Sequence, residues 1–175
     1  MPNIIFLRAD LFDSSTQTLT NTVNTVGIMG AGIAKQFKAR FPAMFQDYKA
    51  RCGRKEIQTG EPYLWKGANG DGTWVLNFPT KRHWRGNSKI EWIEQGLVFL
   101  MNHYREWNIR SLAMPALGCS LGGLNWDQVK PLMVRYLEQM DIPVEIYEPR
   151  RHPMLHKEVR PPKRKTKTFV QPELF

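Results

Sequence analysis

The stretch NTVNTVGIMGAGIAKQF, residues 21–37, predicts the end of a strand, a glycine-rich loop and the start of a helix. The β-branched segment 18–23 is typical of a strand. Gly27, Gly30 and Gly32 let the backbone approach a ligand, and amides at the start of a helix can bind phosphate oxygens. No GK[ST] follows, so this is not a Walker A loop. The alternative is a tight turn that only packs a helix on a sheet.

A second glycine-rich loop, MPALGCSLGGLNW at residues 114–126, repeats the order of strand, loop and helix. It follows a predicted strand at 111–114, and Asn125 is a suitable N-cap for a helix that reaches about Met140. Ligands of layered α/β domains bind at the carboxyl ends of strands, so we expect the two loops to lie together. Two such loops suit a diphosphate better than a monophosphate.

Strand-like and helix-like segments alternate along the rest of the chain. Asn69-Gly70-Asp71-Gly72 is a hairpin signal, which predicts that its two flanking strands are antiparallel. Ser88 and Glu91 form an S-x-x-E capping box for the longest predicted helix. The further expected elements are strands at 4–8, 63–66, 74–78 and 143–147 and helices at 32–40, 43–51 and 88–107. Six strands with interleaved helices predict an α/β domain with a mixed sheet.

Length and composition indicate one globular domain, because the chain has 175 residues and 42% of them are hydrophobic. No apolar stretch approaches the roughly 18 residues that cross a membrane, and the N-terminus does not resemble a signal peptide. We therefore expect a cytoplasmic protein that does not bind a membrane. Cys52 and Cys119 form no CxxC pair and the histidines show no zinc spacing, so neither disulfides nor a metal site are expected.

Positive charge is concentrated at the C-terminus of a chain whose formal net charge is +9. We expect residues 1–149 to form the domain and residues 150–175 to form a basic, flexible tail with eight Lys/Arg and two Glu. Such a tail suits a phosphate backbone, and a solvated, solubilising end is the alternative. Its last residues, QPELF, resemble the Q-x-x-L-F peptide that binds the bacterial sliding clamp, with Gln171, Leu174 and Phe175 as anchors.

Four motifs occur in the order RADLF (8–12), NTVNTVGIMGAGIAKQF, NFPTKRHWRGNS (77–88) and MPALGCSLGGLNW. Together they resemble the macrodomain family over roughly residues 3–149. Within that family the chain is most similar to the DarG-type DNA ADP-ribosyl glycohydrolases, and next to the human terminal ADP-ribose protein glycohydrolase. The resemblance implies a three-layer α/β/α fold around a mixed, about six-stranded sheet, with ADP-ribose as ligand and no cofactor.

The resemblance also implies which residues bind ADP-ribose. Asp10 matches the acid that accepts a hydrogen bond from the adenine amino group, and its alternative role is a turn or cap residue. Asn24 would bind the distal ribose, while Asn21 would have a structural or supporting role. The further expected contacts are Leu11, Gly30, Ala31, Gly32, Ile33, Ala34, Pro115, Leu117, Gly118, Cys119, Ser120 and Leu121.

Lys81 is the candidate catalytic residue, together with Asn24, because similar glycohydrolases have a lysine at this point that acts at the anomeric carbon. A neutral amine can attack an oxocarbenium-like centre or organise the groups around it, provided that its pKa falls. The alternative is an ordinary exposed loop lysine. The relatives that act on protein have an acid after the Gly-Cys pair of the second loop. Here no acid follows the Gly-Cys pair, and the nearest one, Asp127, lies inside a predicted helix. The missing acid argues against a protein-directed enzyme, and the GGL-x-W arrangement agrees better with the DNA-directed branch.

Cations and an aromatic ring surround Lys81 in sequence, namely Arg82, His83, Trp84 and Arg85. This mixture binds single-stranded nucleic acid, although Trp84 packed on the domain among solvated cations is the alternative. We therefore expect a monomeric glycohydrolase that cleaves an N- or O-glycosidic bond to remove ADP-ribose from nucleic acid, above all from single-stranded DNA bases, in an antitoxin-like or anti-defence role. The alternatives are a non-catalytic ADP-ribose reader, a glycohydrolase acting on protein, and an ADP-ribose 1″-phosphate phosphatase.

Overall fold

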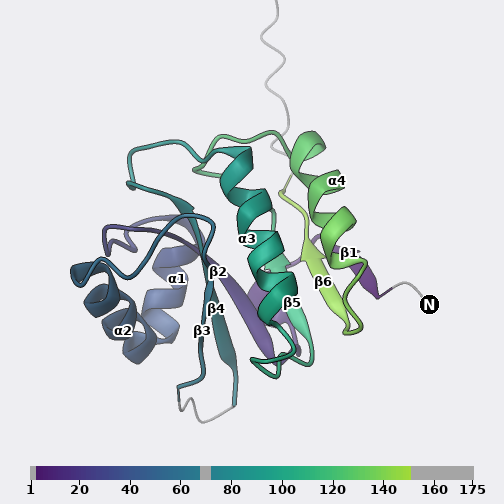
Figure 1. The fold of residues 1–175 in the computed structure, drawn as a ribbon, viewed down its shortest axis with the longest axis horizontal. Helices are drawn as coiled ribbons and strands as arrows, with labels where there is room; N and C mark the ends of the chain where they lie inside the picture. Colours follow the sequence, from purple (N-terminus) through teal and green to yellow (C-terminus); the bar gives the residue numbers. More distant parts are fainter. Residues whose placement is uncertain (1–2, 68–71, 151–175) are drawn as a thin grey trace, which may run out of the picture.

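The computed structural model describes residues 3–67 and 72–150, which form one sheet with helices on both faces (Figure 1). The strands are β1 (Ile4–Leu7), β2 (Thr18–Asn24), β3 (Tyr63–Trp65), β4 (Trp74–Lys81), β5 (Leu112–Pro115) and β6 (Val144–Tyr147). The helices are α1 (Gly32–Arg40), α2 (Pro42–Gly53), α3 (Ile90–His103) and α4 (Trp126–Leu137), with a short 3-10 helix η1 (Leu11–Asp13). No helix in this part of the chain is long and apolar enough to span a membrane.

The six strands are ordered β1-β6-β5-β2-β4-β3. All neighbouring pairs are parallel except β3 and β4, which are antiparallel with Tyr63 opposite Asn77. This confirms the mixed sheet and the antiparallel pair predicted from the sequence. The hairpin signal itself lies mostly outside the described residues. Because five strands run the same way, their carboxyl ends meet at one edge of the sheet, and the loops that follow them gather there.

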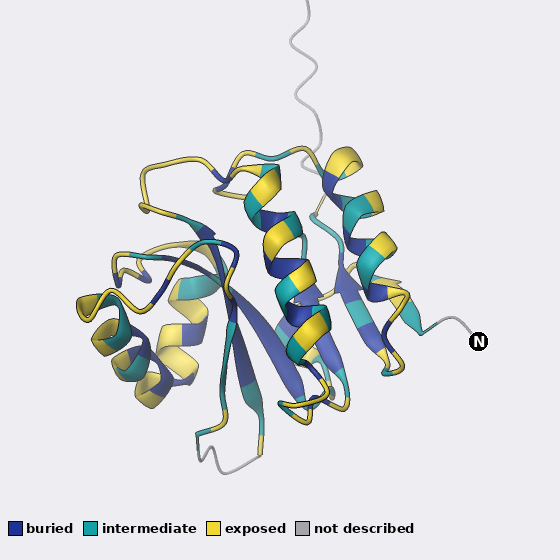
Figure 2. Ribbon diagram, in the orientation of Figure 1, coloured by how far each residue is buried: buried dark blue, intermediate teal, exposed yellow. Residues whose placement is uncertain are grey.

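Alternating side chains of the central strands build two separate cores, as the two-residue period of a strand requires. In β5, Leu112 and Met114 pack with the buried faces of α3 and α4, whereas Ala113 packs with α1 and α2. In β4, Phe78 belongs to the first core and Val75 to the second. The helices therefore form two outer layers, and buried residues line both faces of the sheet (Figure 2). The predicted three-layer α/β/α architecture is confirmed.

The predicted capping box of the longest helix is wrong. α3 begins two residues after Ser88, and its N-cap is Lys89, which has no side-chain capping bond. Ser88 is buried instead, and its backbone amide donates to the carbonyl oxygen of Gly122 at 2.9 Å. Packing against the loop between β5 and α4 holds Ser88 outside the helix, so a tertiary contact overrides the local capping signal.

Other element ends differ from the predictions by a few residues. Asn125 caps α4 as predicted, and its Oδ1 accepts from the amide of Asp127 at 2.9 Å. The helix ends at Leu137, however, three residues before the predicted Met140. β4 is longer than predicted and runs on to Lys81, so this residue ends a strand instead of following one. Lys81 is therefore held by a sheet, which restrains its backbone.

Gly96 of α3 should be required by the packing of this helix on the sheet. A methyl group at Gly96 would lie 2.3 Å from a ring carbon of Phe78, which is fully buried. We expect Gly96→Ala to lower the free energy of unfolding by about 1–3 kcal/mol, because overpacking outweighs the gain in helix propensity. Urea denaturation measures this difference. The control is Gly53→Ala at the end of α2, where the added methyl meets open space; equal stabilities would contradict the tight contact.

Candidate functional site

Three loops lie at the carboxyl edge of the parallel strands, toward the upper left of Figure 1. The first glycine loop (residues 25–31) joins β2 to α1, and the second glycine loop (residues 116–125) joins β5 to α4. The cationic loop (residues 82–89) joins β4 to α3. β2 lies between β4 and β5 in the sheet, so the three loops begin on adjacent strands.

A β-bulge places the two candidate catalytic residues opposite each other. Val23 pairs with Pro79, whereas the next residue of β2, Asn24, pairs with Lys81, so Thr80 is the extra residue of β4. Pro79 has no N–H with which to continue the ladder, and proline within a sheet is typical of a bulge. Bulges re-aim side chains next to sites. Sequence reasoning missed this bulge, although the proline of NFPTK was its signal.

The side chain of Lys81 connects the cationic loop with the second glycine loop. Its Nζ donates to the carbonyl oxygen of Leu121 at 2.7 Å and to that of Trp84 at 3.5 Å. Partial burial lowers the pKa of Lys81 below its ordinary value. The side chain of Leu121 also approaches the start of α1, since its Cδ1 lies 3.3 Å from the place of a Cβ on Gly32. The second glycine loop therefore contacts both Lys81 and the first residue of α1.

Asn24 organises the first glycine loop in this structure. Its Oδ1 accepts from the backbone amides of Val26 at 3.0 Å and Ile28 at 3.4 Å, and its Nδ2 donates to the carbonyl oxygen of Ile28 at 2.7 Å. The hydroxyl oxygen of Tyr48 lies 2.8 Å from both the Oδ1 and the carbonyl oxygen of Asn24. Burial raises the pKa of Tyr48, so this hydroxyl stays protonated and donates.

Tyr48 is a residue that sequence reasoning missed, because it belongs to an ordinary buried stripe of α2. Asn21 lies deeper than Asn24 and is fully buried. Its Nδ2 donates to Oδ1 of Asn77 on the neighbouring strand at 3.1 Å. A bond within the sheet is a structural role, which is the role that the sequence analysis favoured for Asn21.

The start of α1 offers unoccupied backbone donors. Ala31 is the N-cap and makes no side-chain capping bond, and the first turn has no acidic residue. Gly30, Ala31 and Gly32 are exposed, whereas Ile33 and Ala34 are half-buried. The first amides of a helix lack partners within the helix and carry the positive end of its dipole. This end of α1 can therefore bind an anionic group such as a phosphate.

The second glycine loop presents a buried base and an exposed tip. Leu117 and Gly118 are buried, whereas Ser120 is exposed and Leu121 is 60% exposed. Pro115, which ends β5, is half-buried, as is Cys119. Burial raises the pKa of Cys119 to about 12, so it stays a thiol near neutral pH and is a poor nucleophile.

Asp10 lies at the same edge of the sheet, just after β1, and is exposed. Its Oδ1 accepts from the amide of Phe12 at 3.0 Å and so caps η1, which is the alternative role expected for this residue. Leu11 is buried in the core beside α1 and α2. The carboxylate of Asp10 therefore caps η1 and is also exposed to solvent at the carboxyl edge of the sheet.

The cationic loop holds an aromatic cluster that is open to solvent. Trp84 is 43% exposed, and the ring of His83 stacks on it with centroids 5.4 Å apart. The guanidinium of Arg85 lies 4.4 Å from the ring centre of Trp84, and that of Arg82 lies 5.1 Å from the ring of Trp92. Trp84 is thus not packed away in the domain. The proposed clamp anchors Gln171, Leu174 and Phe175 lie outside the described residues.

Removing the hydroxyl of Tyr48 should loosen the first glycine loop. In Tyr48→Phe the carbonyl groups of Asn24 lose a buried donor, at a cost of about 1–2 kcal/mol in unfolding free energy. We expect faster amide hydrogen exchange at Val26 and Ile28 as well. The control is Tyr104→Phe, which removes a hydroxyl bonded to Asp141 at 2.6 Å beyond the far end of α3. Unchanged exchange in Tyr48→Phe, or equal acceleration in both variants, would contradict a specific role in this loop.

Comparison with known proteins identifies the family. The macro domain family matches residues 20–133. A Thermosipho africanus protein named "DNA ADP-ribosyl transferase-DNA ADP-ribosyl glycohydrolase fusion protein" is 45% identical, covering 84% of this chain and 42% of that protein. Its structure, described as DarTG in complex with ADP-ribose, superposes with a TM-score of 0.82 and covers 86% of this chain and 42% of that chain.

Two further relatives agree with this match. The macrodomain of Mycobacterium tuberculosis DarG is 43% identical with a TM-score of 0.80, covering 83% of this chain and 97% of that one. The human "ADP-ribose glycohydrolase OARD1" is 26% identical, covering 82% of this chain and 90% of that protein. The chain spans only 42% of the length of the curated Thermosipho relative. The family match covers most of the sheet and all three loops, and the chain belongs to the macro domain family.

Proposed function

We propose that the chain is an ADP-ribosyl glycohydrolase that removes ADP-ribose from nucleic acid, with single-stranded DNA bases as the main target. The observation that carries this proposal is the bulge that sets Asn24 opposite Lys81, where Leu121 of the second glycine loop contacts both Lys81 and the start of α1. The Thermosipho relative, which is 45% identical, is named as a DNA ADP-ribosyl glycohydrolase fused to a transferase, and this supports the same chemistry here.

The diphosphate would lie between the start of α1 and the second glycine loop, where backbone amides supply donors. Asn24 would face the distal ribose from the first glycine loop, and Asp10 would accept from the adenine amino group. This assignment places the anomeric carbon near the bulge, within reach of Lys81. A ligand stretched between these groups crosses the carboxyl ends of β1, β6, β5, β2 and β4 in turn.

Lys81 would act as a neutral amine at the anomeric carbon. Its Nζ forms a bond to that carbon while the glycosidic bond breaks, and the bonding electrons leave with the base. The proton released by the nitrogen neutralises the departing base, and water then replaces the amine to release ADP-ribose. Burial lowers the pKa of Lys81, which increases the fraction of neutral amine.

Three alternatives predict different products. A reader would bind ADP-ribose without turnover, and a phosphatase would release phosphate from ADP-ribose 1″-phosphate. A protein-directed glycohydrolase would be favoured by an acid in the second glycine loop, but residues 116–125 include neither Asp nor Glu. Asp127 lies in the first turn of α4, where its amide is part of the Asn125 cap. The open cluster around Trp84 favours a nucleic-acid target over protein.

We also propose that the protein reverses the action of a DNA-modifying transferase, as an antitoxin-like or anti-defence enzyme. The name of the Thermosipho relative joins a DNA ADP-ribosyl transferase with a glycohydrolase in one chain, which supports such a pairing. The same proposal includes a monomeric state, a cytoplasmic location and binding of the C-terminal peptide to a sliding clamp.

Lys81→Ala should reduce the release of ADP-ribose from a single-stranded oligonucleotide modified on one base. We expect kcat to fall by about 10²- to 10⁴-fold, the usual contribution of a positioned proton-transfer or nucleophilic group. The assay measures free ADP-ribose, with ADP-ribosylated protein as a parallel substrate and Lys38→Ala, an exposed lysine of α1, as control. Binding of ADP-ribose by the unaltered protein without release from either substrate would overturn the glycohydrolase in favour of a reader.

The rate should depend on pH through Lys81. If the neutral amine reacts, kcat/KM on the modified oligonucleotide rises as pH rises through the pKa of Lys81, which burial lowers below its ordinary value, and levels off above it. Lys81→Arg should lack this rise, because a guanidinium stays charged throughout the range. A profile for the unaltered enzyme that is flat from about pH 6 to 10 would contradict a neutral-amine step.

A further inference from the structure

The two helical layers differ sharply in charge. α1 and α2 carry five Lys/Arg and one acid, whereas α3 and α4 together carry two Lys/Arg and three acids. The two acids in and just after α2 are each paired with an arginine. Asp47 accepts from Nε of Arg51 at 2.9 Å, and Glu56 accepts from Nε of Arg54 at 2.6 Å. Positive charge therefore remains on this layer after its acids are neutralised.

Two lysines, one in α2 and one just after it, contribute to this remaining positive charge. Lys49 and Lys55 are both exposed, and neither forms an ion pair with a carboxylate of the described residues. Each is thus free to meet a phosphate without first breaking a bond to an acid. Exposed lysines that lack partners are common on protein surfaces, so their position relative to the site decides whether they have a function.

A chain of contacts joins these lysines to the candidate site. The hydroxyl of Thr25 in the first glycine loop donates to the carbonyl oxygen of Arg82 at 2.8 Å. Two residues along this loop, the place of a Cβ on Gly27 lies 3.7 Å from Cγ of Lys49. Lys55 follows two residues after the end of α2. One continuous surface therefore leads from Lys81 across the first glycine loop to the end of α2.

Apolar side chains are exposed along this surface. Val26 and Ile28 of the first glycine loop are each 44% exposed, and Trp84 of the cationic loop is 43% exposed. The surface thus combines cations with exposed apolar side chains, and the aromatic ring of Trp84 lies two residues after Arg82 in the cationic loop. Single-stranded nucleic acid is bound where cations meet its phosphates and aromatic rings stack on its bases. An acidic protein segment would use the cations but would leave the apolar groups uncovered.

We infer that this surface, called the lysine strip and formed by Arg82, Val26, Ile28, Lys49 and Lys55, binds the single strand that flanks the modified base. The inference rests on the proposed function and adds to it the path of the polynucleotide outside the ADP-ribose site. It also assigns the free lysines in and just after α2 to substrate recognition. The protein would then recognise several nucleotides beside the modified base, and not only the base itself.

Binding of an unmodified, fluorescent single-stranded oligonucleotide of about 15 nucleotides tests the strip separately from catalysis. The full chain is compared with Lys49→Gln/Lys55→Gln by fluorescence anisotropy over a salt series. Each lost phosphate contact removes about 0.7 from the slope of log K against log salt for single strands, so two lysines should lower it by about 1.4. At 0.1 M salt we expect binding to weaken about tenfold.

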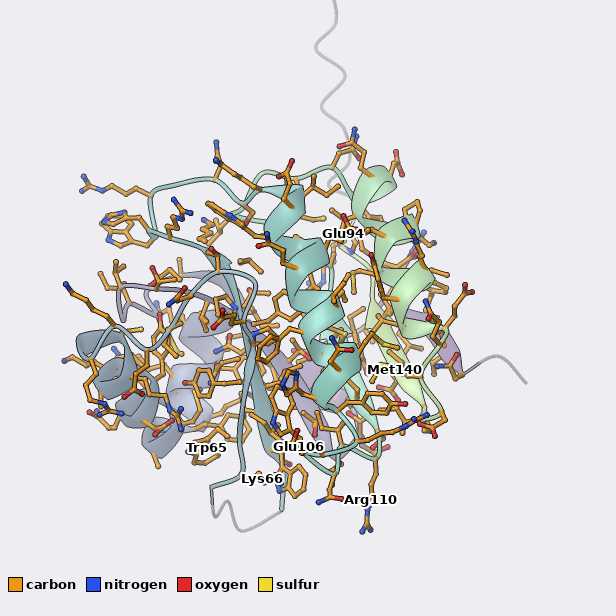
Figure 3. All side chains as sticks on the ribbon, viewed as in Figure 1. Trp65, Lys66, Glu94, Glu106, Arg110 and Met140 are labelled. Atoms are coloured by element: carbon orange, nitrogen blue, oxygen red, sulfur yellow. The ribbon has the colours of Figure 1, made fainter. Side chains whose placement is uncertain are left out.

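The matched control is Lys66→Gln/Arg110→Gln, which removes the same charge at the edge of the sheet where the parallel strands begin, opposite the site (Figure 3). Equal losses in both double variants would overturn the strip, as would equal competition by an acidic peptide of the same charge. Failure of the proposed function is seen separately, as absence of ADP-ribose release by the unaltered protein. Oligonucleotide binding that is weakened only in the strip variant would support the inference.

Discussion

The pairing of β2 with β4 is the constraint on which the site depends. These two central strands are parallel and in register from Thr18 opposite Trp74 to Val23 opposite Pro79. Proline then interrupts the ladder, and the extra residue in β4 brings Lys81 opposite Asn24. Everything that follows these strands, including the first glycine loop and the cationic loop, takes its position from this register. A shift by one residue would turn each side chain of β2 to the opposite face of the sheet.

A buried amide pair helps to specify that register. Asn21 and Asn77 are both fully buried, face each other across the two strands and share a hydrogen bond of 3.1 Å. If the pairing slipped, each buried side-chain amide would lose its hydrogen-bond partner. The free-energy cost of leaving them unpaired exceeds what the bond itself contributes. A polar pair in the middle of a hydrophobic sheet is therefore a device for alignment. Asn21 lies three residues before Asn24 in β2, and Asn77 lies four residues before Lys81 in β4, so the pair acts close to the place where Asn24 and Lys81 meet.

The sequence was sufficient for the architecture because its signals are local and agree with one another. Glycine loops, the Asn125 cap and short β-branched runs each predict an element that the structure contains. The site was less predictable, since its details depend on contacts between distant segments. Ser88 carries a sound capping signal but is held by Gly122, and the hydroxyl of Tyr48 reaches a loop more than twenty residues earlier in the chain. The sequence of a single helix does not reveal a hydrogen-bond partner in a distant segment of the chain.

The first glycine loop is organised before any ligand arrives. The amide of Asn24 holds the loop from within, Tyr48 fixes that amide from α2, and Thr25 attaches the loop to the segment that follows Lys81. A loop that is already ordered in the folded protein loses less conformational entropy when a ligand binds, so the ligand binds more tightly. It also means that Asn24 has little freedom to leave its present bonds. The proposed ribose contact would therefore have to use the hydrogen-bonding capacity that these bonds leave, while the bonds themselves shape the first glycine loop.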